Sequence, residues 1–99
     1  MIHVIAVLTA KIGHRAALLA AFQEIVPAVL QEPGCIEYRP VVDAEHSSVK
    51  FGADTLVMIE KWESQAALDT HGTAPALTGL MERAKHLIAQ ADVYLMQDA

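Results

Sequence analysis

The residues that decide the fold are Leu56-Val-Met-Ile-Glu-Lys-Trp-Glu-Ser-Gln-Ala-Ala-Leu-Asp-Thr-His71. They begin as an apolar run and reach Ser64, a residue type that favours the N-terminal cap of a helix. This pattern predicts a buried strand that leads directly into a short helix. Alternate side chains of a strand share a face, so Glu60 and Trp62 lie together, and the helix returns His71 toward the strand end. We therefore expect a carboxylate, an indole and an imidazole at one edge of a sheet.

Hydrophobic periodicity predicts the elements around this stretch. We expect strands at Ile2–Ala10, Cys35–Asp43, Leu56–Trp62 and Asp92–Gln97, a brief strand at Val49–Phe51, and helices at Arg15–Glu32, Ser64–Thr70 and from Pro75 to about Gln90. Pro27 removes one hydrogen bond inside the long helix, and Pro40 places part of the second strand at a sheet edge. The order of elements is typical of a ferredoxin-like α+β fold, an antiparallel sheet with helices on one face.

The composition indicates that this fold needs a partner. The chain has 99 residues, of which 54% are hydrophobic, and we interpret residues 1–99 as a single domain. A domain of this size buries only roughly 60–65% of its unfolded surface. Ile2–Ala10 and Leu56–Trp62 carry apolar residues on both faces, whereas the helices cover one face. We infer a homodimer, a dimeric α/β barrel formed when two sheets pack face to face.

Charge and cysteine content exclude several classes of partner. The net charge is −5, and the seven Lys and Arg residues form no basic patch, which argues against nucleic acid. The apolar start, Ile2–Ala10, lacks a basic flank and is too short to cross a bilayer, so we expect no membrane association and a cytoplasmic protein. The single cysteine, Cys35, permits no internal disulfide and fits a reducing compartment.

Three residues of the central stretch are candidates for chemistry, and each also has a structural interpretation. Glu60 has apolar neighbours that would raise its pKa and suit it to proton transfer, or it forms a salt bridge to Arg39 or Lys61. His71 is a base that faces a pocket, or it caps the C-terminal end of its helix. Trp62 lines a ligand pocket, or it is a core anchor whose indole N–H finds one partner.

The other histidines and the cysteine favour structural roles. None of the five histidines lies in a dense metal-ligand arrangement, so we expect no metal site. His3 is expected on a strand prone to be an edge, and His14, His46 and His86 have polar neighbours, which indicates that all four are solvated. Cys35 follows a Pro-Gly turn and is interpreted as a small buried apolar residue rather than a nucleophile.

Two motifs resemble those of a known family. Glu32-Pro-Gly-Cys-x-x-Tyr38 and Glu60-x-Trp-Glu-Ser-x-x-x-Leu-x-x-His71 resemble the antibiotic biosynthesis monooxygenase family, and within it the small bacterial quinol monooxygenases, over residues 2 to 97. The resemblance implies a ferredoxin-like homodimer with one pocket per subunit between sheet and helices. It also implies that a quinol or polycyclic phenol, the small aromatic substrate, is oxidised by O2 without cofactor, metal, haem or flavin.

The resemblance also implies roles for individual residues. His71 is the expected base, Glu60 orients the substrate or relays a proton, and Trp62 completes the predicted catalytic set. The predicted substrate-binding residues are Tyr38, Met58, Phe22 and Met81. The first strand has no Asn, and Leu80-Met81-Glu82 stands where haem-degrading relatives carry an iron-binding His, so haem is not expected. Met58 also stands where polyketide-pathway members carry an Asn, a departure from their mechanism.

Two further hypotheses keep the fold and change the function. Relatives with the same motifs process a phosphorylated autoinducer sugar, so the chain would be an isomerase or degradation enzyme for a small signalling molecule. A phosphate group calls for convergent Arg, Lys or helix N-terminal amides, and the cations here are sparse. The chain is otherwise a non-catalytic dimer that binds a hydrophobic metabolite, which predicts saturable binding without turnover.

Overall fold

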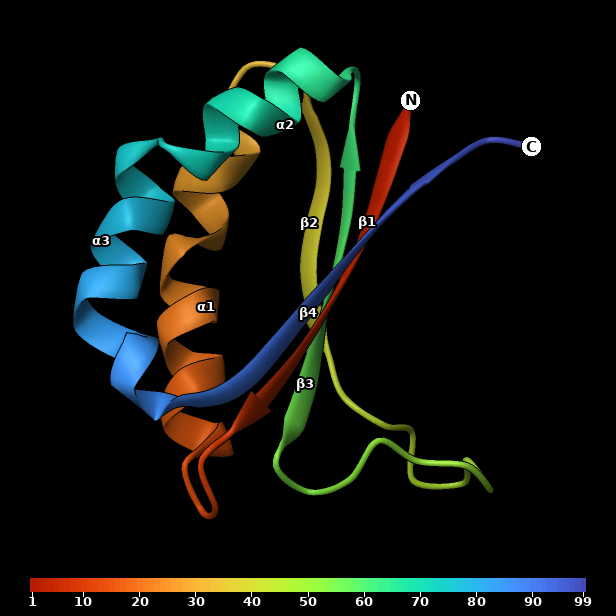
Figure 1. Cartoon of the computed structure of the whole chain (residues 1–99), viewed down its shortest axis with the longest axis vertical. Coiled ribbons are helices and arrows are strands. Elements are labelled where there is room, and N and C mark those ends of the chain that lie inside the picture. Colours follow the sequence, from red (N-terminus) through yellow and green to blue (C-terminus); the bar gives the residue numbers. More distant parts are fainter.

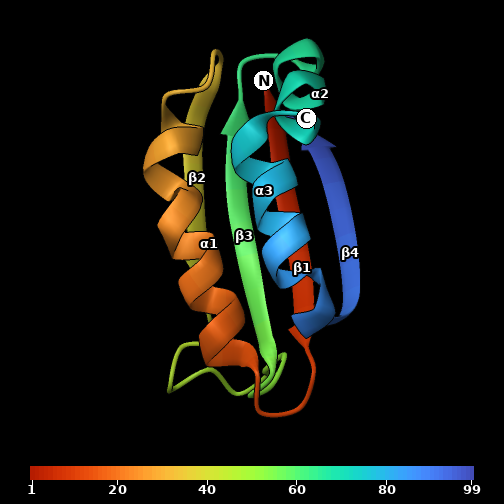
Figure 2. The same ribbon diagram turned by 90° about the vertical axis from the view of Figure 1, so that its left-hand side faces the viewer.

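The computed structural model describes every residue from Met1 to Ala99 and contains one four-stranded antiparallel sheet. The elements are β1 (Ile2–Ala10), α1 (Arg15–Leu30), β2 (Cys35–Val41), β3 (Thr55–Trp62), α2 (Gln65–Gly72), α3 (Pro75–Ala84), the short 3₁₀ helix η1 (Lys85–Leu87) and β4 (Ile88–Gln97). The strand order is β2-β3-β1-β4, and all three helices lie on one face of the sheet (Figures 1 and 2). The predicted ferredoxin-like α+β architecture is therefore confirmed.

The two apolar strands form the centre of the sheet. β1 pairs with β3 from Ile2 opposite Trp62 to Thr9 opposite Thr55, and its other edge pairs with β4. Because β1 is internal, the expectation that His3 lies on an edge-prone strand is wrong. The His3 ring instead lies 2.9 Å from the Asp98 carboxylate, just beyond the end of β4.

The core lies between the sheet and the helices. Its fully buried side chains come from β1, β3, α1 and α3, and the largest are Trp62, Leu18, Leu56, Met58, Leu80, Val4 and Val29. Burying an apolar side chain of this size contributes about 1.5–3 kcal/mol each. The alternate residues of β1 and β3 face away from the helices and are covered only in part: Thr55 and Val57 are buried, whereas Ile5, Val7 and Ile59 are half-buried.

A tight turn joins α1 to β2. The helix ends at Leu30 rather than at the predicted Glu32, and it continues through Pro27 as predicted. Gly34 in this turn has φ +82°, a conformation that L side chains rarely adopt, and a Cβ there would lie 2.5 Å from the Ala67 Cβ of α2. The turn therefore approaches α2 more closely than any other residue type would allow.

β2 is an edge strand, as Pro40 predicts. It ends at Val41 rather than at Asp43, and its register shifts between Cys35 and Glu37. After this irregularity Tyr38 pairs with Glu60 on β3 and is buried. The pairing brings these two side chains together at the end of the sheet near α2.

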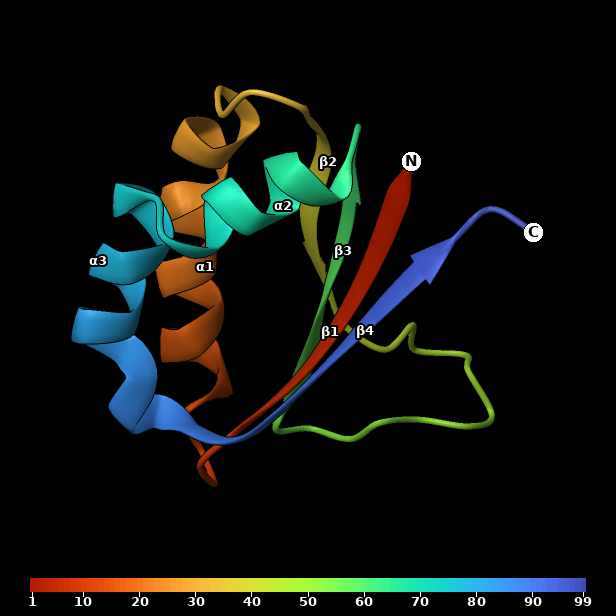
Figure 3. The same ribbon diagram turned by 45° about the horizontal axis from the view of Figure 1, so that its top comes forward.

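The long connection between β2 and β3 holds no strand. The predicted brief strand at Val49–Phe51 is therefore wrong. The Phe51 and Gly52 N–H groups instead donate to the Asp43 carboxylate at 3.0 and 2.9 Å, so a side chain replaces the strand partner. Figure 3 shows the loop on the side of the sheet opposite the helices.

The C-terminal part of the chain differs most from the prediction. The last helix ends at Ala84 instead of near Gln90, and β4 begins at Ile88 instead of Asp92. Pairing with β1 explains the change, because β4 matches β1 along nearly its whole length and the Leu87 carbonyl accepts from the Lys11 N–H at 2.8 Å. The added ladder bonds outweigh the helical pattern of the sequence.

The second face of the sheet is apolar and open. Phe51, Tyr94 and Met96 are exposed there, and they border a groove that also includes Ile5 and Val7. None of the helices combines the length and the apolar character needed to cross a membrane.

Candidate functional site

A cavity of about 500 Å³ lies between the sheet and the helices. It has 18 lining residues, 13 of them hydrophobic, contributed by all four strands and all three α-helices. They are Val4, Ala6, Leu8, Phe22, Tyr38, Met58, Glu60, Gln65, Leu68, Asp69, His71, Gly72, Leu77, Met81, Ile88, Ala91, Val93 and Leu95. A largely apolar cavity with a few convergent polar groups is the usual form of a small-molecule site.

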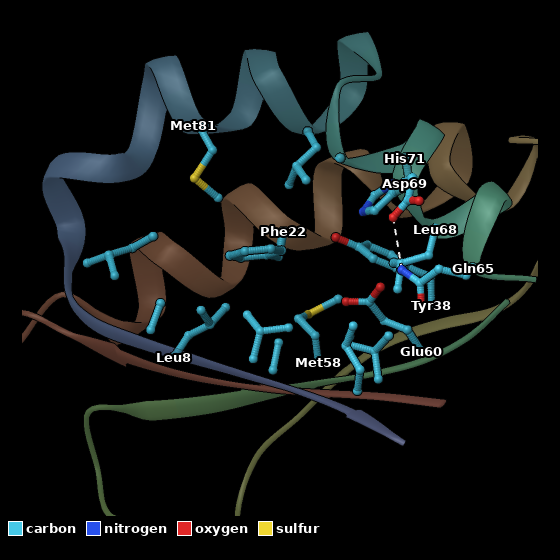
Figure 4. A pocket seen from close by; sticks show the side chains of 18 residues that line it. Leu8, Phe22, Tyr38, Met58, Glu60, Gln65, Leu68, Asp69, His71 and Met81 are labelled. Carbon is cyan, nitrogen blue, oxygen red and sulfur yellow. Dashed lines mark hydrogen bonds between the residues drawn. The ribbon is translucent and has the colours of Figure 1, made fainter. Parts of the chain in front are cut away.

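The polar groups gather at one end of the cavity. Figure 4 shows Tyr38, Glu60 and His71 at this end, and Phe22, Leu8 and Met81 toward the other. Gln65 and Asp69 of α2 also lie at the polar end, where the Gln65 amide donates to the Asp69 carboxylate at 2.9 Å. The cavity is thus suited to a ligand that carries its hydroxyl groups at one end of an apolar body.

The Glu60 carboxylate is buried and has one partner from the protein. The Trp62 Nε1–H donates to Glu60 Oε1 at 3.0 Å, two residues along the same face of β3. The predicted alternative, a salt bridge to Arg39 or Lys61, is wrong, because Arg39 lies 3.6 Å from the Glu37 carboxylate instead.

Burial changes the acid–base properties of Glu60 and Tyr38. Desolvation raises the pKa of Glu60, and the nearby Glu32 carboxylate acts in the same direction, while the Trp62 hydrogen bond and the electrostatic influence of His71 in its protonated form oppose the rise. Burial also raises the pKa of Tyr38 far above its usual value, with further contributions from Glu60 and Glu32. Tyr38 is therefore a neutral phenol, and Glu60 retains a proton to higher pH than an exposed glutamate.

His71 lies in the last turn of α2 and is buried. Its Nδ1 atom is 2.7 Å from Oε1 of Glu32, and its ring lies against Trp62 and Tyr38 with centroid separations of 4.7 and 5.3 Å. α2 begins where predicted, since Ser64 Oγ accepts from the Ala67 N–H at 3.1 Å. This cap fixes the direction in which α2 leaves β3, and so it fixes the position of His71 one helix length later.

Trp62 does not line the cavity, contrary to one of its predicted roles. Its side chain is fully buried behind Glu60 and His71, and its indole N–H is satisfied by Glu60. The alternative interpretation, a core anchor with one polar partner, describes its position. Any effect of Trp62 on a bound molecule must pass through these two neighbours.

The four residues predicted to bind substrate, Tyr38, Met58, Phe22 and Met81, all border the cavity. The sequence interpretation missed Gln65 and Asp69, whose exposed positions on a short helix resemble any solvated helix face. It also missed the wall formed by Val93 and Leu95 of β4 and the contact of Glu32 with His71. Glu32 belongs to a motif noted in the sequence, but nothing in its spacing connects it with a histidine 39 residues later.

Cys35 lies near Glu32 and Glu60 but does not border the cavity. Burial, Glu32 and Glu60 raise the pKa of its thiol to about 11. The thiol therefore stays protonated near neutral pH, and a protonated thiol is a poor nucleophile. This agrees with the interpretation of Cys35 as a small apolar residue.

Comparison with known proteins gives the same family across nearly the whole chain. Residues 1–83 match the antibiotic biosynthesis monooxygenase family. The chain is 39% identical to a protein of Escherichia coli (strain K12) named "Probable quinol monooxygenase YgiN". The alignment of the two covers 98% of this chain and 97% of the E. coli protein.

Solved structures agree with this result. A crystal structure titled as an antibiotic biosynthesis monooxygenase superposes with a TM-score of 0.84 at 30% identity, covering 100% of this chain and 99% of the other. The structure of PA3566 from Pseudomonas aeruginosa gives a TM-score of 0.83 at 26% identity, covering 99% and 93%. The family match and the E. coli relative support an oxidoreductase of the monooxygenase type. The chain belongs to the antibiotic biosynthesis monooxygenase family.

Proposed function

We propose that this protein is a cofactor-independent monooxygenase that oxidises a quinol, or a related polycyclic phenol, with O2. The observation that carries the proposal is the asymmetric cavity, whose apolar body ends in a histidine, a buried carboxyl group and a neutral phenol. An aromatic diol fits this distribution, with its ring among Phe22, Met58 and Met81 and one hydroxyl at the polar end. The E. coli relative named a quinol monooxygenase supports the same substrate class.

The reaction requires no outside reductant. His71 Nε2 accepts a phenolic proton, and the resulting quinolate, which is electron-rich, transfers one electron to O2. The radical pair combines at a ring carbon to give a hydroperoxide, which loses water and leaves a carbonyl group. One oxygen atom enters the product and the other leaves as water. The quinol supplies all four electrons, two when it becomes a quinone and two when its ring carbon is hydroxylated.

The surrounding residues assist this chemistry by position and by exclusion of water. The Tyr38 phenol donates a hydrogen bond to the oxygen on which negative charge develops. Glu60, held by Trp62, orients the second polar group of the substrate or relays a proton to the peroxide. The apolar walls remove water from the quinolate, which strengthens these interactions and limits the escape of reactive oxygen.

The charge of the cavity bears on the alternative of a phosphorylated signalling molecule. None of its lining residues is Lys or Arg, and Glu60 and Asp69 place two carboxyl groups at the polar end. A phosphate there would meet carboxyl groups instead of cations. This arrangement favours the quinol over a sugar phosphate.

The active form in this proposal is a homodimer. The uncovered sheet face carries Ile5, Val7 and Tyr94 beside Phe51 of the β2–β3 connection, and a second sheet would remove this apolar surface from water. Sedimentation equilibrium measures the mass of the protein in solution and so distinguishes a monomer from a dimer. A monomer at micromolar concentration would contradict the proposal.

Oxygen consumption tests the proposed reaction. The protein, dialysed against chelator, is mixed with a reduced naphthoquinone, and the rate is compared with autoxidation of the same quinol in buffer. We expect saturable uptake above background, a hydroxylated quinone that takes one atom from labelled O2, and loss of the added rate in His71→Ala. Saturable binding without uptake would leave only the hypothesis of a metabolite-binding dimer.

A further inference from the structure

Glu32 and His71 form a close pair at the polar end of the cavity. Glu32 Oε1 lies 2.7 Å from His71 Nδ1, and the two side chains are only 16% and 5% exposed. Glu32 follows α1, whereas His71 closes α2, so the contact joins two helices that are distant in the sequence. The His71 imidazole also packs against the rings of Trp62 and Tyr38, which restrict its orientation.

The turn that carries Glu32 is held rigidly against α2. The Cys35 N–H donates to the Glu32 carbonyl at 3.1 Å, and the Glu63 N–H donates to the Gly34 carbonyl at 2.8 Å. Gly34 allows the close approach of this turn to Ala67. These hydrogen bonds position the backbone of the turn that carries Glu32 independently of the side-chain contact with His71.

The geometry determines which ring nitrogen is free. A carboxylate accepts hydrogen bonds and does not donate them, so the Glu32 contact requires a proton on Nδ1. A neutral imidazole then carries no proton on Nε2. Nε2 of His71 and the Tyr38 hydroxyl have no hydrogen-bond partner in the protein. Every side-chain nitrogen or oxygen that lacks a partner is accessible to solvent, and both residues line the cavity, so these two atoms are open to it.

We propose that Glu32 is the positioning residue of this site: it holds His71 in the Nδ1–H tautomer, with Nε2 directed to the phenolic proton of the substrate. The proposal rests on the proposed function, since it assigns the geometry of the same base. Glu32 does not touch the substrate itself. Its second effect is electrostatic, because an imidazolium formed when His71 takes a proton remains paired with the carboxylate at Nδ1.

The other groups around the ring do not replace Glu32. Tyr38 of β2 is a neutral phenol, Glu60 of β3 is engaged by Trp62, and Asp69 of α2 is engaged by Gln65. α3 and β4 contribute only apolar residues to the cavity. Within the chain, Glu32 is thus the one carboxylate bonded to the imidazole.

Nitrogen NMR of the histidine side chains tests the tautomer without any substrate. The His71 signals are assigned by their loss in His71→Ala and observed at a pH where a titration shows the ring to be neutral. In the wild type we expect a protonated Nδ1 and an unprotonated Nε2. In Glu32→Gln, whose amide both accepts and donates, we expect a mixture of tautomers, whereas Glu24→Gln, an exposed change of the same charge on α1, retains the wild-type pattern.

Kinetics then tests the consequence. We expect Glu32→Gln to lower kcat by at least about tenfold with little change in KM, and Glu32→Asp to recover part of the loss. A wild-type Nε2–H tautomer, or a tautomer unchanged in Glu32→Gln, would overturn the positioning role. The absence of quinol oxidation in the wild type would overturn the proposed function and leave the NMR result to stand alone, so the two failures are distinguishable.

Discussion

Replacing Gly34 with alanine tests whether the contact between the Glu32–Cys35 turn and α2 holds the site together. The added Cβ would lie 2.5 Å from the Ala67 Cβ and 3.7 Å from the Glu63 Cβ. The first distance is too short for two carbon atoms, so the turn and α2 must separate. Their separation would draw Glu32 away from His71, and we expect a loss of activity together with the loss of stability.

A second glycine provides the magnitude and the control. Gly13 has φ +80°, almost the same as Gly34, but a Cβ there would have no neighbour within 4 Å. Gly13→Ala therefore incurs only the backbone strain, which we place at about 1 kcal/mol. Gly34→Ala adds overpacking of about 1–3 kcal/mol, so we expect a total of about 2–4 kcal/mol.

Urea denaturation followed by Trp62 fluorescence measures both variants. The comparison must be made at one protein concentration, because self-association would shift the midpoint. The difference between the two free energies of unfolding isolates the clash, since the backbone term cancels. Equal destabilisation of the two variants would refute the reasoning, and so would strictly additive effects of Gly34→Ala and Ala67→Gly in the double variant, because removing the opposing methyl group should relieve the clash.

Three further predictions concern the cavity. Folding raises the pKa of Glu60 above 4.5, so the folded chain binds a proton more tightly, and the free energy of unfolding falls as pH rises from 4.5 through the raised pKa. Glu60→Gln should flatten this part of a plot of urea midpoint against pH. An unchanged slope would mean that another group causes the pH dependence. Tyr38→Phe should change stability by less than about 1 kcal/mol, because its hydroxyl has no partner in the protein, yet lower kcat by about tenfold or more in the oxygen assay. Met81→Trp should fill the apolar end and raise KM by at least about tenfold, whereas retained KM would place the substrate elsewhere.

The fold was predictable because its strongest signals are local. The apolar run before Trp62, the cap at Ser64 and the proline in β2 each act within a few residues, and each appears in the structure as predicted. The errors occur where a distant partner decides. Ile88 and Gln90 continue a helical pattern, but they pair with Ala10 and Thr9 of β1, with a shift of register between the two pairs.

The candidate site was only half predictable for the same reason. Residues on the inner face of β3 and on the apolar stripes of the helices border the cavity because periodicity alone directs them inward. Glu32 meets His71 only because Gly34 allows the turn to approach α2, a contact between segments that no spacing rule joins. Trp62 is the opposite case. It lies two residues after Glu60 on the same face of β3, as predicted, but it is buried too deeply to border the cavity.

β4 connects the candidate site with the open face of the sheet. Its side chains alternate, so that Val93 and Leu95 border the cavity, while Tyr94 and Met96 border the groove on the other face. β4 is an edge strand, paired with β1 alone, and its side chains are largely exposed in the single chain. A partner sheet that covered Tyr94 and Met96 would immobilise the strand and, with it, one wall of the cavity. Dimerisation and substrate binding are then expected to be linked, each favouring the other.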